Sequence, residues 1–221
     1  MASSESPKRL LFRQFAAVAK AVAHEHRLEL LEALAQGERS VEALAGCTGL
    51  SIANASQHLQ RMRRAGLVET RRDGKFINYR LTGKAVLDLV AALTRIGEGH
   101  LAEVEKIVRS YFDSRDAMEP VSRAELVARM KNGDVQVLDV RPPDEFGMAH
   151  IAGAINIPLT ALKRKLAALD PNKEIVAYCR GPWCVLSFEA VAMLRAKGYR
   201  VRRLEDGLPE WKAASLPIAT G

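Results

Sequence analysis

The spacing of apolar residues changes partway along this 221-residue chain, and this change constrains the fold more than any other feature. Up to residue 112, apolar side chains recur every three or four residues, which predicts helices. From residue 121, short apolar runs alternate with helical segments, as in a parallel sheet covered by helices. The polar run DSRDAMEP between them is typical of a linker. We therefore expect a mainly-α domain at 1–112, a linker at 113–120 and an α/β domain at 121–221.

The first domain has the element order of a winged helix-turn-helix. Segments 8–22 and 24–35 have amphipathic helical spacing. After a short helix and a tight turn, Ser51 is a natural N-cap for a second helix that ends at Gly66. Asp73-Gly74, flanked by alternating residues, is the strongest short signal of a two-stranded hairpin, here the wing.

A long helical pattern follows the wing, from Lys84 to Phe112, with Gly97 and Gly99 as a candidate kink. A domain of about a hundred residues cannot cover the apolar stripe of so long a helix. We therefore expect a homodimer in which this last helix pairs with its symmetry mate and with the first helix.

Positive charge is concentrated in the second helix and the wing. The chain has a net charge of +7, and the segment from Arg61 to Lys84 holds eight Lys or Arg against two acidic residues. Such a cluster is typical of a polyanion-binding surface, with a solvated basic face as the alternative. Short polar side chains early in the second helix would read base edges, and later arginines would contact phosphates. The expected DNA contacts are Ser51, Asn54, Ser56, Gln57, His58, Arg61, Arg63, Arg64, Arg71, Arg72, Lys75 and Tyr79, and the expected inward face is Ile52, Ala55, Leu59 and Met62.

Residues 23–82 resemble the ArsR/SmtB family of winged-helix repressors, most specifically in SIANASQHLQRMRRAGLV, residues 51–68. The resemblance implies a homodimer that leaves double-stranded operator DNA when an inducer binds. Relatives that sense soft metals carry a cysteine pair, whereas this chain has Cys47 alone. Zinc-sensing relatives carry a D-x-H segment followed by H-x-x-E, and of these ligands this chain has only the last two, His100 and Glu103. Sulfide-responsive relatives need a thiol on the last helix, and residues 84–112 contain none. We expect no metal site, and no sensing by this domain alone.

The segments VLDVRPPDEFGMAHIAGAINIP, AYCRGPWC and LEDGLPEW make residues 121–218 similar to a single-domain rhodanese. Cys179 lies between the apolar strand IVAY and a helix starting near Cys184, so loop N–H groups and the positive helix end would stabilise its thiolate. That thiolate would attack a sulfur donor and hold a persulfide; a buried structural cysteine is the alternative. Arg180 would add positive charge at the mouth, and by family analogy Asp139 and Arg141 would support the loop. The expected site is Cys179, Arg180, Gly181, Pro182, Trp183, Cys184, Asp139 and Arg141.

The loop departs from its relatives in two informative ways. Phosphatase relatives need an Arg six positions after the cysteine, and Val185 is there, which disfavours phosphoryl chemistry. The common rhodanese pattern C-x-x-G-x-R places an Arg where this chain has Cys184, which favours a small or protein-bound persulfide over thiosulfate. Cys184 would resolve the Cys179 persulfide into a disulfide, or alternatively would cap and pack at the helix start.

Together these features predict a cytoplasmic DNA-binding regulator whose α/β domain takes up sulfane sulfur and alters DNA affinity. Neither a signal peptide nor an apolar stretch of membrane-spanning length is expected, and no cofactor. The first alternative is a sulfurtransferase with an accessory DNA-binding or dimerisation domain. The second is a purely structural rhodanese module that recruits a partner.

Overall fold

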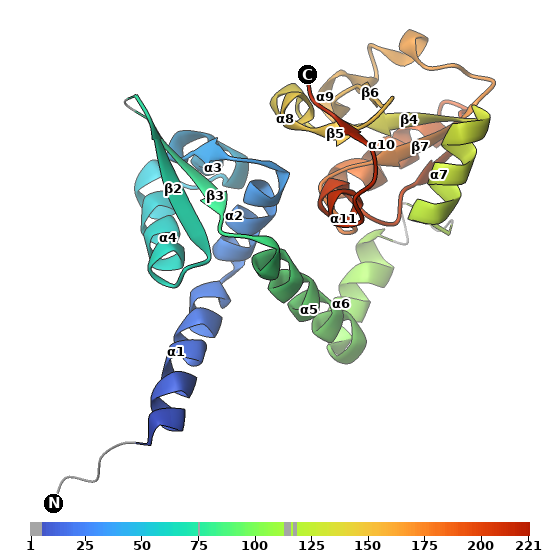
Figure 1. Cartoon of the computed structure of the whole chain (residues 1–221). Coiled ribbons are helices and arrows are strands. Elements are labelled where there is room, and N and C mark those ends of the chain that lie inside the picture. Colours follow the sequence, from blue (N-terminus) through green and yellow to red (C-terminus); the bar gives the residue numbers. More distant parts are fainter. Residues whose placement is uncertain (1–5, 75, 113–115, 117–118) are drawn as a thin grey trace, which may run out of the picture. The chain divides into compact units, whose positions relative to one another are not determined.

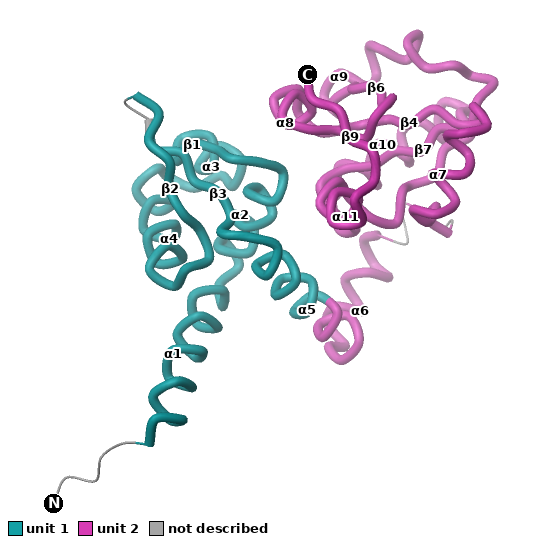
Figure 2. Tube along the Cα trace, viewed as in Figure 1, with its two compact units in different colours: residues 1–94 teal, residues 95–221 magenta. Residues whose placement is uncertain are grey.

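The computed structural model describes residues 6–74, 76–112, 116 and 119–221. The chain forms two compact units, residues 1–94 and 95–221, which Figure 2 colours separately. The units divide within helix α5 (Lys84–His100), whereas the sequence analysis placed the first domain boundary after residue 112. Most of the expected linker, residues 113–115, 117 and 118, lies outside the described residues.

The first unit is a winged helix-turn-helix (Figure 1). Its antiparallel sheet has the order β1-β3-β2, so a short third strand joins the two strands predicted for the wing. Gly74 has a φ of +59° at the hairpin turn, a conformation that glycine adopts at no steric cost. The elements are α1 (Pro7–Val22), α2 (Glu25–Gln36), β1 (Arg39–Ser40), α3 (Val41–Thr48), α4 (Ile52–Arg64), β2 (Val68–Asp73) and β3 (Phe76–Leu81).

The long helix predicted after the wing is interrupted. It forms α5, α6 (Ala102–Ile107) and a π-helical turn, η1 (Val108–Phe112). The break lies at Leu101, whose backbone is extended, and not at either glycine. A Cβ on Gly97 would lie 3.9 Å from side-chain atoms of Leu101 and Val104, an ordinary van der Waals distance, so the packing here does not require glycine.

The second unit contains a four-stranded parallel sheet of order β6-β4-β7-β8, which confirms the predicted α/β class. After β6, a four-residue helix is followed by a 3-10 turn. The elements are α7 (Arg123–Asn132), β4 (Val135–Asp139), α8 (Pro143–Met148), β5 (His150–Ile151), β6 (Ile155–Asn156), α9 (Leu159–Leu162), η2 (Leu166–Ala168), β7 (Glu174–Tyr178), α10 (Val185–Arg195), β8 (Val201–Arg203), α11 (Leu208–Ala213) and β9 (Ile218–Ala219).

The central strand β7 supplies both cores of the second unit. Ile175, Ala177 and then Cys179 belong to one apolar cluster, together with residues of α10. Val176 and Tyr178 belong to the other, together with residues of α7 and α11. Because successive side chains of a strand point to opposite faces, this alternation aims Cys179 and Tyr178 into different layers at the same end of the sheet. Within the described ranges, every helix is too short or too polar to cross a bilayer.

Candidate functional site

Helix α4 carries the residues expected to read DNA. It begins where predicted, because the Ser51 hydroxyl accepts a hydrogen bond from the Asn54 N–H at 3.2 Å. Asn54 and Gln57 are exposed, and Ser56 and His58 are half-buried. The arginines expected to contact phosphates are exposed in its last turn, where the negative helix end also favours cations; they are Arg61, Arg63 and Arg64.

Two expectations for this surface are corrected. Tyr79, expected to contact DNA, is only 5% exposed and belongs to the core of the first unit. The two-residue alternation of β3 turns its side chain inward, so it is not available to a nucleic acid. Ile52, expected to face inward with Ala55, Leu59 and Met62, is 54% exposed. It is the first residue of α4 and lies beyond the last layer of the core, whereas the other three are buried.

The wing carries fewer unpaired charges than its composition indicates. Arg71 forms an ion pair with Glu38 at 2.7 Å, and Arg80 pairs with Glu69 at the same distance. The Nε–H of Arg72 donates to the Gly74 carbonyl at 3.2 Å. Lys75, also expected at the DNA surface, lies outside the described residues.

Three histidines gather beside α4, which the sequence analysis did not anticipate. The His58 ring lies 4.6 Å from that of His24 and 5.9 Å from that of His26, centroid to centroid. His24 caps α2 by accepting a hydrogen bond from the His26 N–H. Burial, and then the nearby His24 and Arg27, lower the pKa of His58. In the described part of the chain, no three His, Cys, Asp or Glu side chains are placed to hold a metal ion.

The second candidate site is the loop from Cys179 to Cys184, between β7 and α10, which we call the cysteine loop. The two sulfur atoms are joined in a disulfide, with the Cα atoms 6.1 Å apart. Cys179 is 1% and Cys184 7% exposed, and Cys184 is the N-cap of α10. In this oxidised state neither sulfur is a thiolate. The expected thiolate therefore concerns only the reduced protein, in which the disulfide is open.

Arg180, which was expected to add positive charge at the mouth of the loop, is held by a carboxylate. Its guanidinium forms a two-pronged ion pair with Glu145 of α8, with an Nη2 to Oε1 distance of 2.6 Å. The Glu145 side chain is 1% exposed, so Arg180 offsets a buried negative charge. No sequence pattern indicated Glu145, because it lies 35 residues earlier in the chain.

Asp139 and Arg141 belong to a buried hydrogen-bond network that holds the end of β7, the strand before the cysteine loop. Both side chains are fully buried, and Arg141 Nη2 pairs with Asp139 Oδ2 at 2.5 Å. The Tyr178 hydroxyl donates to the same carboxylate at 2.5 Å and accepts from the Ile151 N–H at 3.0 Å. Burial, and then the negative charge of Asp139, raise the pKa of Tyr178, so its hydroxyl keeps its proton. This network anchors the residue immediately before Cys179.

Gly207, in the D-G-x-x-x-W motif, explains why that motif accompanies the cysteine loop. A Cβ at this position would lie 2.4 Å from the carbonyl carbon of Arg180 and from the Gly181 nitrogen. The next residue, Leu208, donates its N–H to the Cys179 carbonyl at 3.2 Å. Glycine is therefore required by close backbone approach, and α11 is tied directly to the cysteine loop.

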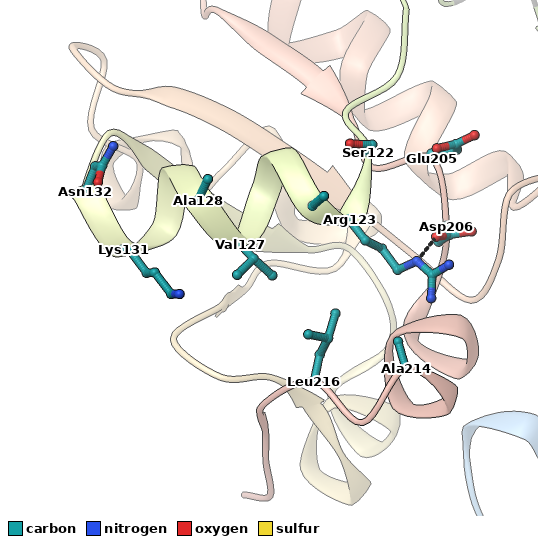
Figure 3. Close-up of a pocket in the computed structure, with 11 residues that line it drawn as sticks. Ser122, Arg123, Val127, Ala128, Lys131, Asn132, Glu205, Asp206, Ala214 and Leu216 are labelled. Carbon is teal, nitrogen blue, oxygen red and sulfur yellow. Dashed lines mark ion pairs between the residues drawn. The ribbon is translucent and has the colours of Figure 1, made fainter.

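A hollow of about 1000 Å³ lies elsewhere on the second unit, between α7 and the segments that precede and follow α11 (Figure 3). Figure 3 shows the Arg123–Asp206 ion pair on one side of it, with an Nε to Oδ2 distance of 2.6 Å. Its lining contains no Cys or His and no residue of the cysteine loop. We therefore place the candidate sulfur chemistry at the cysteine loop.

Known protein families match the two parts of the chain separately. The rhodanese-like domain family matches residues 122–214, and a helix-turn-helix domain family matches residues 22–71. The HTH-type transcriptional regulator Rv0324 of Mycobacterium tuberculosis is 43% identical over 221 residues, covering 100% of this chain and 97% of that protein. A sulfurtransferase of Allochromatium vinosum is 31% identical over 86 residues, 38% of this chain and 78% of its own.

Solved structures resemble each unit separately. The homodimeric winged helix-turn-helix domain of Mb0332 from Mycobacterium bovis, described as a possible ArsR-family regulator, is 43% identical. It covers 47% of this chain and 95% of its own, with a TM-score of 0.42. A rhodanese-related protein of Thermoplasma volcanium is 29% identical and covers 47% of this chain and 100% of its own, with a TM-score of 0.43.

The full-length relative decides the classification, since it matches both units in one chain. The family matches fall on the same two segments that the sequence analysis identified. The chain therefore belongs to the HTH-type transcriptional regulators, with an N-terminal ArsR-type winged helix-turn-helix followed by a C-terminal rhodanese-like domain.

Proposed function

We propose that this regulator is a homodimeric repressor whose affinity for operator DNA changes when its cysteine loop takes up sulfane sulfur. The observation that carries the proposal is the bond between Cys179 Sγ and Cys184 Sγ. A loop whose two sulfurs lie within bonding distance has an open dithiol state and a closed disulfide state. A transcriptional regulator with such a loop has a covalent signal that it can convert into DNA affinity.

The chemistry balances with a persulfide, R–S–SH, as the donor. The Cys179 thiolate attacks the outer sulfur, which it keeps as a persulfide while the donor leaves as the thiol R–SH. The Cys184 thiolate then attacks Cys179 Sγ, the terminal sulfur leaves as hydrosulfide, and the disulfide closes. The sulfane sulfur is reduced to hydrogen sulfide and the two cysteines are oxidised. One cysteine proton ends on the leaving thiol R–SH, and the other converts the released hydrosulfide into hydrogen sulfide.

Two features of the loop support a persulfide rather than thiosulfate as the donor. Cys184 occupies the position at which rhodanese relatives have an anion-binding Arg. Arg180, the cation inside the loop, is held by Glu145 in a two-pronged ion pair. A dianionic donor would have to compete with this carboxylate for the guanidinium, whereas a low-molecular-weight or protein-bound persulfide would not.

Exposed apolar side chains support the dimer. On α1, Leu11, Phe12 and Phe15 are 58%, 57% and 60% exposed, and on α5 Leu93 and Ile96 are 44% and 59% exposed. Large apolar side chains gathered on two helices indicate a surface that a partner covers. We propose that α1 and α5 cover each other across a two-fold axis, which would set two copies of α4 against successive major grooves of DNA in the cytoplasm.

The test measures operator affinity with and without a sulfur donor. Footprinting on the DNA upstream of the protein's own gene defines the operator, and fluorescence anisotropy then gives Kd at fixed salt for protein reduced first and then treated with inorganic polysulfide. Wild type should change its Kd by about tenfold or more. Cys179→Ser and Cys184→Ser should not respond, whereas Cys47→Ser, which removes the exposed free thiol of the other unit, should respond like wild type.

Mass spectrometry separates the chemical steps. Cys184→Ser should retain a persulfide on Cys179, because the first step needs one thiol and only the second needs the other. An unchanged response in Cys179→Ser would overturn the proposal. Persulfide turnover with no change in the Kd of wild type would instead favour a sulfurtransferase in which the DNA-binding unit is accessory.

A further inference from the structure

Trp183, the single aromatic residue of the cysteine loop, contacts the segment that precedes the rhodanese-like domain. Trp183 Nε1–H donates to the Glu98 carboxylate of α5 at 2.5 Å. Its ring also packs edge-on against Phe112 of η1, with the centroids 5.2 Å apart, and Phe112 packs against Phe188 of α10 at 4.7 Å. These contacts lie within the second compact unit.

Helix α5 belongs to both compact units. It begins at Lys84 in the first unit and continues beyond Thr94 into the second, and Figure 2 shows the change of colour partway along it. Glu98 lies in the part that belongs to the second unit. A helix transmits displacement along its axis because each turn is hydrogen-bonded to the next. Glu98 is therefore joined by continuous helical backbone to the residues of α5 that belong to the first unit.

Trp183 lies next to the disulfide in the chain. Trp183 directly precedes Cys184, and closure of the bond holds the Cα atoms of the two cysteines 6.1 Å apart. The preceding residue, Pro182, is anchored through its carbonyl by Arg203 Nη1 at 3.3 Å. Opening the disulfide would remove the covalent restraint on Cys184 and leave the hydrogen bond from its N–H to the Gly181 carbonyl at 3.2 Å. Trp183 lies between the Pro182 anchor and Cys184.

We propose that Trp183 communicates the covalent state of the cysteine loop to α5, through its hydrogen bond to Glu98 and its packing on Phe112. This inference rests on the proposed function, since it supplies the route by which sulfur uptake changes DNA affinity. The closed loop holds Trp183 against Glu98 and Phe112. The open loop releases both contacts and lets the second half of α5 and η1 move.

The experiment compares variants that leave both cysteines in place. Trp183→Phe keeps an aromatic ring beside Phe112 and loses the N–H donor; Glu98→Ala loses the acceptor, and Glu98→Gln keeps an acceptor oxygen. Glu103→Ala, on the adjacent α6, is the matched control. Wild type, Glu98→Gln and Glu103→Ala should show the full polysulfide response of Kd. Trp183→Phe and Glu98→Ala should respond by less than about twofold while still forming the disulfide.

Hydrogen exchange of residues 95–100 gives a readout that does not depend on DNA. In wild type, exchange should differ between dithiothreitol-reduced and polysulfide-treated protein, and in Glu98→Ala the difference should vanish. A full response of Kd in Glu98→Ala would overturn the inference, whatever the response of Trp183→Phe. If Trp183→Phe fails to close its disulfide, Glu98→Ala decides alone, because its substitution lies outside the loop.

The same data separate this inference from the proposed function. A wild type whose α5 exchange changes with the disulfide, but whose Kd does not, would refute the proposed function and leave the Trp183 contact as a coupling element. If the Kd of wild type changes and Glu98→Ala shows the same full change, the inference about Trp183 is refuted and the proposed function stands.

Discussion

Replacing Tyr178 by Phe tests whether the buried network beside the cysteine loop stabilises the rhodanese-like unit. The substitution removes one oxygen and keeps the ring in the core. That oxygen donates to Asp139 Oδ2 at 2.5 Å and accepts from the Ile151 N–H at 3.0 Å. All three residues are 0% exposed, so water cannot replace the lost partner.

The size of the effect follows from these two bonds. A buried donor left without an acceptor costs about 1–3 kcal/mol, and a hydrogen bond to a charged group contributes about 1.5–3 kcal/mol. Asp139 keeps its hydrogen bonds from Arg141 Nε and Nη2. The cost of removing the bond from Tyr178 to this carboxylate therefore lies near the lower end of the range of about 1.5–3 kcal/mol. We expect Tyr178→Phe to lower the free energy of unfolding of this unit by about 3 kcal/mol.

Urea unfolding followed by tryptophan fluorescence measures this loss in the correct unit. The chain has two tryptophans, Trp183 and Trp211, and both belong to residues 95–221. Tyr199→Phe is the matched control, because its hydroxyl donates to the Leu166 carbonyl at 3.3 Å in a partly buried place. It should cost less than about 1 kcal/mol. If the two variants lie within about 0.5 kcal/mol of each other, the network does not stabilise the fold as argued.

Three further predictions concern both units. Gly207→Ala should destabilise the second unit by at least about 1–3 kcal/mol, because its Cβ would lie 2.4 Å from the Arg180 carbonyl carbon; the same urea titration measures this, and an unchanged midpoint would show that the loop yields freely. Because burial lowers the pKa of His58, the unfolded chain binds a proton that the folded chain resists, and stability of the first unit should fall as pH drops below about 6.5. Circular dichroism during urea unfolding should show a weaker pH dependence for His58→Gln, and an equal dependence would contradict the assignment. Arg63→Ala and Arg64→Ala should each reduce the slope of log Kd against log salt by about one, measured by anisotropy; unchanged slopes would exclude phosphate contacts at these positions.

Local signals in the sequence predicted the elements well. Ser51 caps α4 with its hydroxyl as its position indicated, and Gly74 turns the wing. The parallel sheet and the position of the cysteine loop between β7 and α10 also followed from the sequence. Tyr79 was misplaced because its aromatic character suited either a core or a DNA surface, and only strand pairing fixed which face it occupies.

The roles within the cysteine loop were harder to predict. The two thiols and the glycine of the D-G-x-x-x-W motif stood in recognisable patterns, but nothing local indicated that Arg180 is held by Glu145. Nor did the pattern show that Tyr178, which looked like one more apolar strand residue, joins Asp139 to the backbone of Ile151. The hydrogen-bond partners of such side chains come from segments far away in the sequence, so the residues next to them in the chain do not reveal those partners.

By itself the sequence determined where helices and strands begin, which loop carries paired thiols, and which helix presents polar side chains and arginines. Capping and periodicity act between residues at most about four positions apart, so they can be read along the chain. Only tertiary structure decided the partners of Arg180, Tyr178 and Trp183, which lie 35, 39 and 85 residues away. Bringing such distant residues together costs chain entropy, and burial of apolar surface offsets that cost. These contacts therefore form only when the sheet and helices pack.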